Sequence, residues 1–169
     1  ACGRLVNAAD APFAGGAEVI SIWGLDQEQA RQKAADQRIG RVAATPEEAL
    51  QGADFAMVIG RFADSHYAPA LAAIEKGIPT FIDKPFTATS AEARKLAARA
   101  AELGVALCSS SPLRFASDLD DMRTGKGPAT FLSCAPAVCP DPGPAPRLNS
   151  AFFYGLHPLE MLPEHAGYA

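Results

Sequence analysis

The sequence lacks several features that would point to particular classes of protein. It has no uninterrupted apolar run near the roughly 20 residues that a membrane helix needs, and its N-terminus lacks the charged-then-apolar layout of a signal peptide. It also lacks an excess of basic residues, because the net charge is −4, and this argues against nucleic acid as a partner. We therefore expect a cytoplasmic protein with no membrane and no nucleic-acid partner.

Cysteines are few, and none of the four belongs to a CxxC pair. Cys134 and Cys139 lie in a proline-rich segment with no histidine at zinc-finger spacing. We expect free thiols in a reducing compartment and no metal site. With 169 residues, 49% of them apolar and 20% charged, the chain can form one domain, or one domain and part of another.

Apolar, strand-like runs alternate with helical patterns over the first two thirds of the chain. Strands are expected at residues 18–23, 55–60, 79–83 and 105–109, and helices at residues 27–37, 46–51, 65–76 and 90–103. Strands separated by helices of about ten residues indicate an α/β, Rossmann-like, doubly wound parallel sheet. Because the strand runs are continuously apolar, we expect both faces of the sheet to be covered.

Two helix starts are marked by capping residues. Asp26 precedes the helix at 27–37, and Gln29 three residues later completes an approximate capping box. Thr45 is a clearer N-cap, with Pro46 at the first helical position and Glu48 placed to reach back to the cap.

The pattern changes after about residue 121. A helix is expected at 112–126, an extended segment at 128–138, a connection or polyproline loop at 139–146, and helical content interrupted by prolines at 150–165. We therefore divide the chain into a Rossmann-like domain at residues 1–122, incomplete at its N-terminus, and the start of an α+β domain at residues 123–169.

Ligands of an open parallel sheet bind outside the carboxyl ends of its strands. Three short segments fall at such ends: residues 24–26, 60–66 and 83–85. Lys84 is of interest because Pro85 stiffens the backbone that aims it. A lysine at this place can also be an ordinary surface residue at a turn.

The order of these motifs resembles that of the Gfo/Idh/MocA family of nicotinamide-dependent oxidoreductases. The Asp/Glu-Lys-Pro motif of that family appears as Asp83-Lys84-Pro85, and its strand–loop–histidine segment as MVIGRFADSHYAPALAAIEKG, which contains His66. The later Arg-Phe appears as Arg114-Phe115, and the Gly-x-His of the second domain ends at His157. The resemblance runs from about residue 19 to residue 162.

The resemblance implies hydride transfer between NAD or NADP and a hydroxyl or carbonyl of a sugar, inositol or related polyol. Lys84 would stabilise the charge that develops on the reacting oxygen, and His157 would carry its proton. It further implies a homo-oligomer, a dimer or tetramer, for the full-length protein. The implied cofactor contacts are Gly24, Asp26, Gly60, Arg61, Phe62, His66, Asp83, Lys84 and Pro85, and the implied substrate contacts are Arg114, Tyr154 and Glu160.

The chain departs from the family pattern at three places. Arg61-Phe62 stands where Thr-Pro is common, and Glu160 stands where an aspartate is usual. Gly24 occupies the place of the acid that holds the ribose hydroxyls, with Asp26 two residues later, so the choice between NAD and NADP stays open. These departures favour an alternative function, a catalytically degraded relative that binds a ligand or serves as a scaffold.

The glycine-rich turn of a dinucleotide site is missing from the sequence. No GxGxxG occurs in the 169 residues, and residues 3–7 resemble the start of the helix that would follow such a turn. We expect the first strand and its loop to lie upstream of Ala1, so that the chain as it stands binds a dinucleotide poorly. Other interpretations remain open: His157 as a satisfied histidine at a helix start, His66 as a cap or packing residue, Arg114 as a surface ion pair, and the chain as another Rossmann enzyme such as an amino-acid dehydrogenase.

Overall fold

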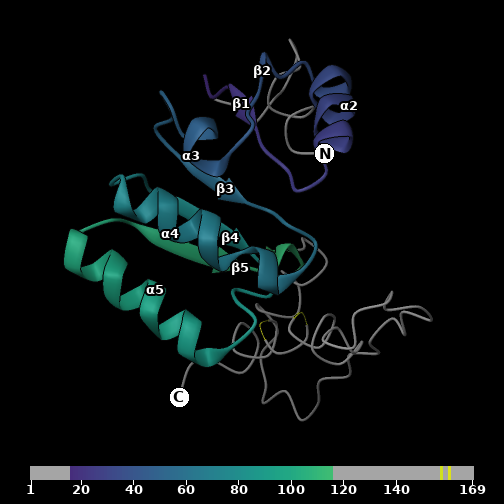
Figure 1. Cartoon of the computed structure of the whole chain (residues 1–169). Coiled ribbons are helices and arrows are strands. Elements are labelled where there is room, and N and C mark those ends of the chain that lie inside the picture. The colour runs from purple at the N-terminus through teal and green to yellow at the C-terminus, as the bar shows by residue number, and fades with distance from the viewer. Residues whose placement is uncertain (1–15, 116–156, 158–159, 161–169) are drawn as a thin grey trace.

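The computed structural model describes residues 16–115, 157 and 160 (Figure 1). Several predictions lie outside these residues: the helix start at 3–7, the end of the helix at 112–126, the segments at 128–138 and 139–146, most of the helical segment at 150–165, the second domain at 123–169, and Tyr154. Cys108 is described, and it is an exposed free cysteine.

Five strands of the described residues form two parallel sheets. Strand β1 (Ser21–Ile22) pairs with β2 (Arg41–Val42), and β3 (Ala56–Val58), β4 (Thr80–Asp83) and β5 (Leu107–Ser110) form a second sheet in the order β3-β4-β5. These strands correspond to positions 3-2 and 4-5-6 of the doubly wound order 3-2-1-4-5-6, and no strand of the described part fills position 1. The parallel α/β class is confirmed, with the sheet in two parts.

Strand β2 was not predicted, and the predicted strands are longer than the observed ones. The missed strand has two residues, and one of them is the charged Arg41, so the segment does not form the apolar run that predicts a buried strand. Its guanidinium hydrogen-bonds the Ser21 hydroxyl on β1 at 3.2 Å and the Gln51 carbonyl at 2.6 Å. The arginine therefore ties β2 to β1 and to the segment that follows α3 through polar contacts.

The helices begin where the capping residues predict. The helices are α2 (Gln27–Gln37), α3 (Pro46–Ala49), α4 (Tyr67–Glu75) and α5 (Ser90–Leu103). A short 3₁₀ turn, η1 (Ala63–Ser65), precedes α4, and a second, η2 (Pro112–Phe115), follows β5. Asp26 accepts from the Gln29 N–H at 2.9 Å, and Thr45 accepts from the Glu48 N–H at 3.2 Å. Glu48 reaches back one residue further than predicted, to the Ala44 N–H at 2.7 Å.

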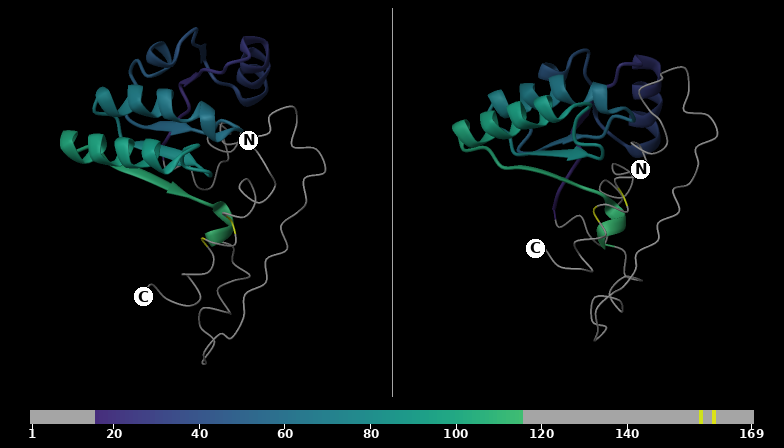
Figure 2. Two further views of the ribbon diagram at one scale, coloured as in Figure 1. Left: turned by 60° about the horizontal axis from the view of Figure 1, so that its bottom comes forward. Right: turned by 90° about the horizontal axis from the view of Figure 1, so that it is seen from below.

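Helices α4 and α5 lie side by side on one face of the β3-β4-β5 sheet (Figures 1 and 2). The core between them and the sheet consists of Val58, Ala70, Ile74, Ile82, Leu96 and Ala100. The prediction that both faces are covered is wrong for β3 in the described part, where Phe55, Met57 and Ile59 are exposed. Side chains alternate between the two faces of a strand. Within these residues, the helices that contact the sheet pack only against the face of β3 that carries Ala56 and Val58.

No helix within the described ranges is long and apolar enough to cross a bilayer. The same residues contain no group of histidine, cysteine and carboxylate side chains that could hold a metal ion.

Candidate active site

The three-stranded sheet brings the ends of β3, β4 and β5 to one edge. The strands are parallel and in register, so Asp83 at the end of β4 lies opposite Ser110 at the end of β5. The residues that follow these strands, among them Gly60, Lys84 and Ser111, therefore gather at this edge, as the sequence predicts for the first two. Such an edge is where parallel sheets bind their ligands.

Ser111 links this edge to two residues from far along the chain. Its hydroxyl hydrogen-bonds Nδ1 of His157, and its main-chain N–H donates to Oε2 of Glu160 at 2.6 Å. Ser111 is fully buried, whereas His157 and Glu160 are half-buried, so both contacts lie at the border between the interior and solvent. The predicted acid Glu160 thus reaches the sheet edge with its longer side chain and accepts there from the backbone.

The pKa values of Lys84 and His157 are both lowered at this edge. Burial is the main cause that lowers the pKa of the Lys84 ammonium, with Asp83 opposing the shift and Arg61 adding to it. The pKa of His157 is also lowered, first by burial and then by the charge of Lys84, while Asp83 and Glu160 oppose the shift. The site therefore favours a neutral imidazole near a lysine whose charged form is destabilised.

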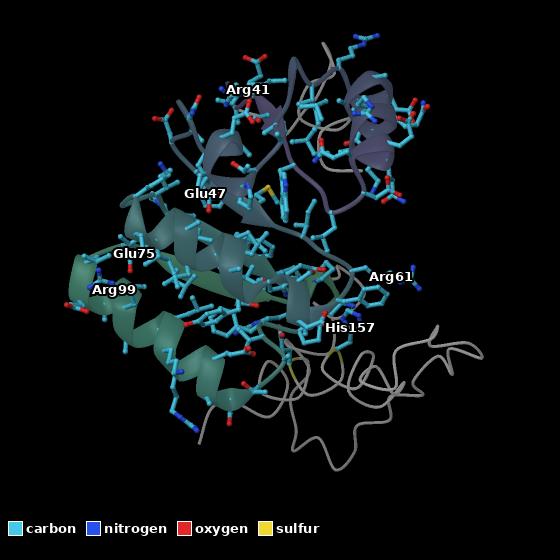
Figure 3. The ribbon with its side chains drawn as sticks, in the orientation of Figure 1. Arg41, Glu47, Arg61, Glu75, Arg99 and His157 are labelled. Atoms are coloured by element: carbon cyan, nitrogen blue, oxygen red, sulfur yellow. The ribbon has the colours of Figure 1, made fainter. Side chains whose placement is uncertain are left out.

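Arg61 and Phe62 follow β3 on the same side of the molecule. Figure 3 shows Arg61 and His157 at the same end of the sheet. The Arg61 guanidinium lies 5.9 Å from the centre of the Phe62 ring, within cation–π range, and Phe62 is exposed. An exposed cation and an exposed aromatic ring thus stand where the family pattern has Thr-Pro.

His66 is fully buried between the ends of β3 and β4. Its Nδ1 lies 2.8 Å from the Pro85 carbonyl oxygen and its Nε2 lies 2.7 Å from the Gly60 carbonyl oxygen. Although His66 immediately precedes α4, its side chain makes no capping hydrogen bond. The His66 side chain therefore does not cap α4, although the residue occupies the N-cap position, and its complete burial agrees with the packing role that the sequence also allowed.

The loop after β1 is tied to the loop after β2. Gln27 donates to the carbonyl oxygens of Gly24 at 3.0 Å and Ala43 at 3.2 Å. The Asp26 carboxylate caps α2. A Cβ at Gly24 would make only ordinary contacts, the nearest at 3.5 Å, so the fold does not itself demand a glycine there. Contact of Gly24 and Asp26 with a cofactor stays a prediction.

Arg114, a predicted substrate residue, lies in η2 just beyond Ser111. Its guanidinium is 5.9 Å from the centre of the Phe115 ring, and its main-chain N–H donates to the Ser111 carbonyl oxygen at 3.1 Å. The structure therefore places Arg114 beside the site edge, and its contact with substrate stays a prediction.

Ser111 and Gln27 are the site residues that sequence reasoning missed. Three consecutive serines at 109–111 end the β5 segment, and nothing in a single sequence distinguishes the last of them. A polar residue directly after the end of a predicted parallel strand is the one signal that could have found Ser111.

Comparisons with known proteins give a family and several solved structures. The Gfo/Idh/MocA family model, described as an oxidoreductase family with an NAD-binding Rossmann fold, matches residues 5–110. A comparison with curated proteins gives no match.

Three of the similar structures illustrate the likeness. A Gfo/Idh/MocA family oxidoreductase from Vibrio cholerae is 25% identical with a TM-score of 0.53, over 60% of this chain and 32% of that one. GenD2 from gentamicin A biosynthesis, in complex with NAD, is 24% identical with a TM-score of 0.59, over 72% and 33%. A probable dehydrogenase from Thermotoga maritima is 15% identical with a TM-score of 0.58, over 63% and 32%. The last two show the fold alone, and the chain spans about a third of each structure.

Proposed function

The chain belongs to the Gfo/Idh/MocA family of oxidoreductases with an NAD-binding Rossmann fold, and from this premise we propose that it carries the hydride-transfer edge of a dehydrogenase. The substrate is a hydroxyl or carbonyl compound of the sugar, inositol or polyol class. One observation carries the proposal: Lys84, His157, Ser111 and Glu160 converge at the carboxyl edge of the sheet, where Lys84 lowers the pKa of His157.

Lys84 and His157 have different roles at the substrate oxygen. In the oxidation direction the C–H bond of the alcohol breaks with its electron pair, and the O–H proton passes to the His157 ring. A nicotinamide cofactor, when bound, would supply the acceptor for this hydride. Lys84 donates a hydrogen bond to the oxygen as negative charge develops on it, and this stabilises the transition state more than the alcohol.

Ser111 suits both directions of this proton transfer. A serine hydroxyl can donate to Nδ1 of His157 or accept from it. When Nδ1 donates to Ser111, the neutral ring has its lone pair at Nε2 and can act as a base. When the hydroxyl donates to Nδ1, the neutral ring has its proton at Nε2 and can act as an acid. A single contact thus supports oxidation and reduction.

The described residues fit part of a nicotinamide cofactor. The loops after β3 and β4 carry carbonyl groups and cations at Gly60, Arg61 and Lys84, and they are suited to the nicotinamide side of the cofactor. The loop at Gly24 and Asp26 is suited to the ribose side of the cofactor. The glycine-rich turn for the pyrophosphate has no counterpart in the 169 residues. Support for NAD therefore comes from the family, whose Rossmann fold binds NAD.

Cofactor binding and turnover test the proposal. NADH fluorescence should change on binding to the protein in its full-length form, and a panel of polyols and sugars should reduce NAD in its presence. Lys84→Met and His157→Gln should each lower kcat by about 100-fold, within the range for loss of an acid–base or oxyanion group, while binding of NADH persists. Absence of NADH binding and of turnover overturns the proposal.

A ligand-binding relative without catalysis is the second candidate. Arg61-Phe62 and Glu160 favour it, since these residues differ from the family pattern. Under this alternative the protein binds a nucleotide or sugar but does not transfer hydride. Measurable reduction of NAD by any polyol removes it.

A further inference from the structure

Ser111 has a hydrogen-bond partner for each of its polar groups. Its hydroxyl contacts Nδ1 of His157, and its main-chain N–H donates to Oε2 of Glu160 at 2.6 Å. Its carbonyl oxygen accepts from the main-chain N–H of Arg114 at 3.1 Å. Because Pro112 follows Ser111, the backbone at Ser111 is biased towards an extended conformation. The main chain and the side chain of Ser111 are therefore both held in place at the end of β5.

Glu160 satisfies the main-chain N–H of Ser111. Ser111 has no exposed surface, and a buried N–H without a partner costs about as much free energy as a lost hydrogen bond. Ser111 also lies one residue beyond the last pair of the β4–β5 ladder, Asp83 and Ser110. Glu160 therefore provides an acceptor where the ladder has ended, and it does so from 49 residues further along the chain.

His157 and Glu160 approach Ser111 from the same short segment. Both residues are helical and stand three positions apart, a spacing that makes side chains neighbours on a helix surface. One contacts the Ser111 hydroxyl and the other contacts its main-chain N–H. A single contact would leave the His157 ring able to pivot about it, whereas two contacts fix the ring relative to the end of β5.

We propose that Glu160 is a positioning residue that holds the His157 segment on the end of β5, and that it is not a ligand of the substrate. The term Glu160 clamp denotes the hydrogen bond from the main-chain N–H of Ser111 to Oε2 of Glu160. The clamp keeps Nδ1 of His157 at the Ser111 hydroxyl, so that Nε2 is the nitrogen that meets the substrate oxygen. The clamp itself rests on these contacts, and only its effect on catalysis rests on the proposed function.

The length of the Glu160 side chain matches the span of the clamp. An aspartate at this position would be shorter by one C–C bond, about 1.5 Å. With the backbone in the same place, the contact of 2.6 Å would then lengthen beyond the range of a hydrogen bond. The clamp therefore gives a physical reason for the glutamate that stands where the family pattern has an aspartate.

Glu160 acts on His157 through its charge as well as through the clamp. Together with Asp83 it opposes the lowering of the His157 pKa that burial and Lys84 cause. The two effects can be separated, because the amide oxygen of a glutamine accepts a hydrogen bond at the same reach without carrying a charge. Glu160→Gln should therefore keep the clamp and lower the pKa of His157 further.

Hydrogen exchange at the Ser111 amide tests the clamp directly in the 169-residue chain. Glu160→Gln keeps the length and an acceptor, whereas Glu160→Asp keeps the carboxylate and loses the length. We expect slow exchange in wild type and in Glu160→Gln, and exchange about 10-fold faster in Glu160→Asp, as for the loss of one hydrogen bond. Glu47→Asp, which changes an exposed residue of α3 away from His157 in Figure 3, is the control and should exchange like wild type. Equal exchange in all four proteins overturns the clamp.

Steady-state kinetics of the full-length protein distinguish a clamp from a substrate ligand. For a clamp we expect Glu160→Asp to lower kcat by about 10-fold with little change in KM. Glu160→Gln should keep kcat and KM near the wild-type values while His157 titrates at a lower pH. A substrate ligand predicts the reverse order, with a raised KM for Glu160→Gln, because a neutral acceptor binds hydroxyl groups less strongly than a carboxylate does. The reverse order overturns the positioning role.

The clamp and the proposed function can fail separately. If the Ser111 amide exchanges faster only in Glu160→Asp, and the full-length protein transfers no hydride, the clamp stands and the dehydrogenase is removed. If the full-length protein is an active dehydrogenase and the Ser111 amide exchanges equally in all four proteins, the clamp alone is removed.

Discussion

Lys84, which directly follows β4, lowers the pKa of His157, although the two residues lie far apart in the sequence. Burial contributes more to this shift than the lysine does, and Asp83 and Glu160 act against it. The relationship has a chemical meaning, because a neutral imidazole can take a proton from an alcohol at neutral pH while a cation next to it stabilises the alkoxide.

Removal of the Lys84 charge should raise the pKa of His157. We expect the His157 Cε1–H resonance of Lys84→Met to titrate at a higher pH than in wild type, because one of the two causes that lower the pKa of His157 is removed while burial remains. Lys95→Met, which removes an exposed lysine from the middle of α5, is the control and should leave the titration unchanged. An unaltered His157 titration in Lys84→Met would contradict the relationship.

The lowered pKa of His157 should also make the protein less stable in acid. Below the usual histidine value of 6.5 the unfolded chain takes up a proton that the folded His157 resists, so the unfolded state binds more protons. The free energy of unfolding therefore falls as the pH drops from 6.5 towards the folded pKa. Urea unfolding at several pH values should show a steeper loss for wild type than for His157→Gln, and parallel curves would be inconsistent with the shift.

Much of the fold could be predicted because its signals are local. The cap at Thr45, the helix at Ser90–Leu103 and the apolar runs of β3, β4 and β5 all depend on residues close in sequence, and each is found in the structure. The family and the Rossmann-like α/β class are confirmed. Strand β2 was missed because its pairing with β1 is a tertiary event in a segment that carries a charge.

A site residue could be predicted from the sequence only where it belongs to a recognisable motif. The Asp83-Lys84-Pro85 motif and His157 were identified in this way, and their placement at one sheet edge agrees with a shared site. The partners of these residues could not be identified, because the contact of Ser111 with His157 joins segments that a single sequence does not relate. The engagement of both nitrogens of His66 likewise depends on how two loops meet.

Loss of the Ser111 hydroxyl should impair proton transfer more than substrate binding. In Ser111→Ala the main-chain N–H still binds Glu160, but Nδ1 of His157 loses its buried partner. We expect kcat to fall by about 10-fold with little change in KM, which corresponds to about 1.4 kcal/mol and to the loss of one buried hydrogen bond. Ser111→Thr should restore much of the rate, since it restores a hydroxyl.

Ser110→Ala is the matched control for this prediction. It changes the neighbouring serine at the end of β5, one residue away from the contact with His157. We expect it to retain the wild-type rate and the wild-type His157 titration. A Ser111→Ala variant that behaves like Ser110→Ala would show that the hydroxyl does not orient the ring.

A side chain at Gly60 should disturb the loop that carries Arg61 and surrounds His66. The Cβ of Gly60→Ala would overlap the Ser65 hydroxyl and press on the His66 ring, so the loop must shift. We expect a lower melting temperature, displaced His66 ring resonances and weaker NADH binding by the full-length protein. Gly40→Ala is the control and should change none of these measurably, because its Cβ meets no atom within 4 Å. The double variant Gly60→Ala/Ser65→Ala should recover part of each loss, because it removes the hydroxyl that causes the closest overlap. If the contact with the His66 ring, 3.2 Å from the new methyl group, is the main cause of the losses, the double variant will not recover them. Comparison of the single and double variants by ¹⁵N NMR distinguishes the overlap with Ser65 from the contact with His66.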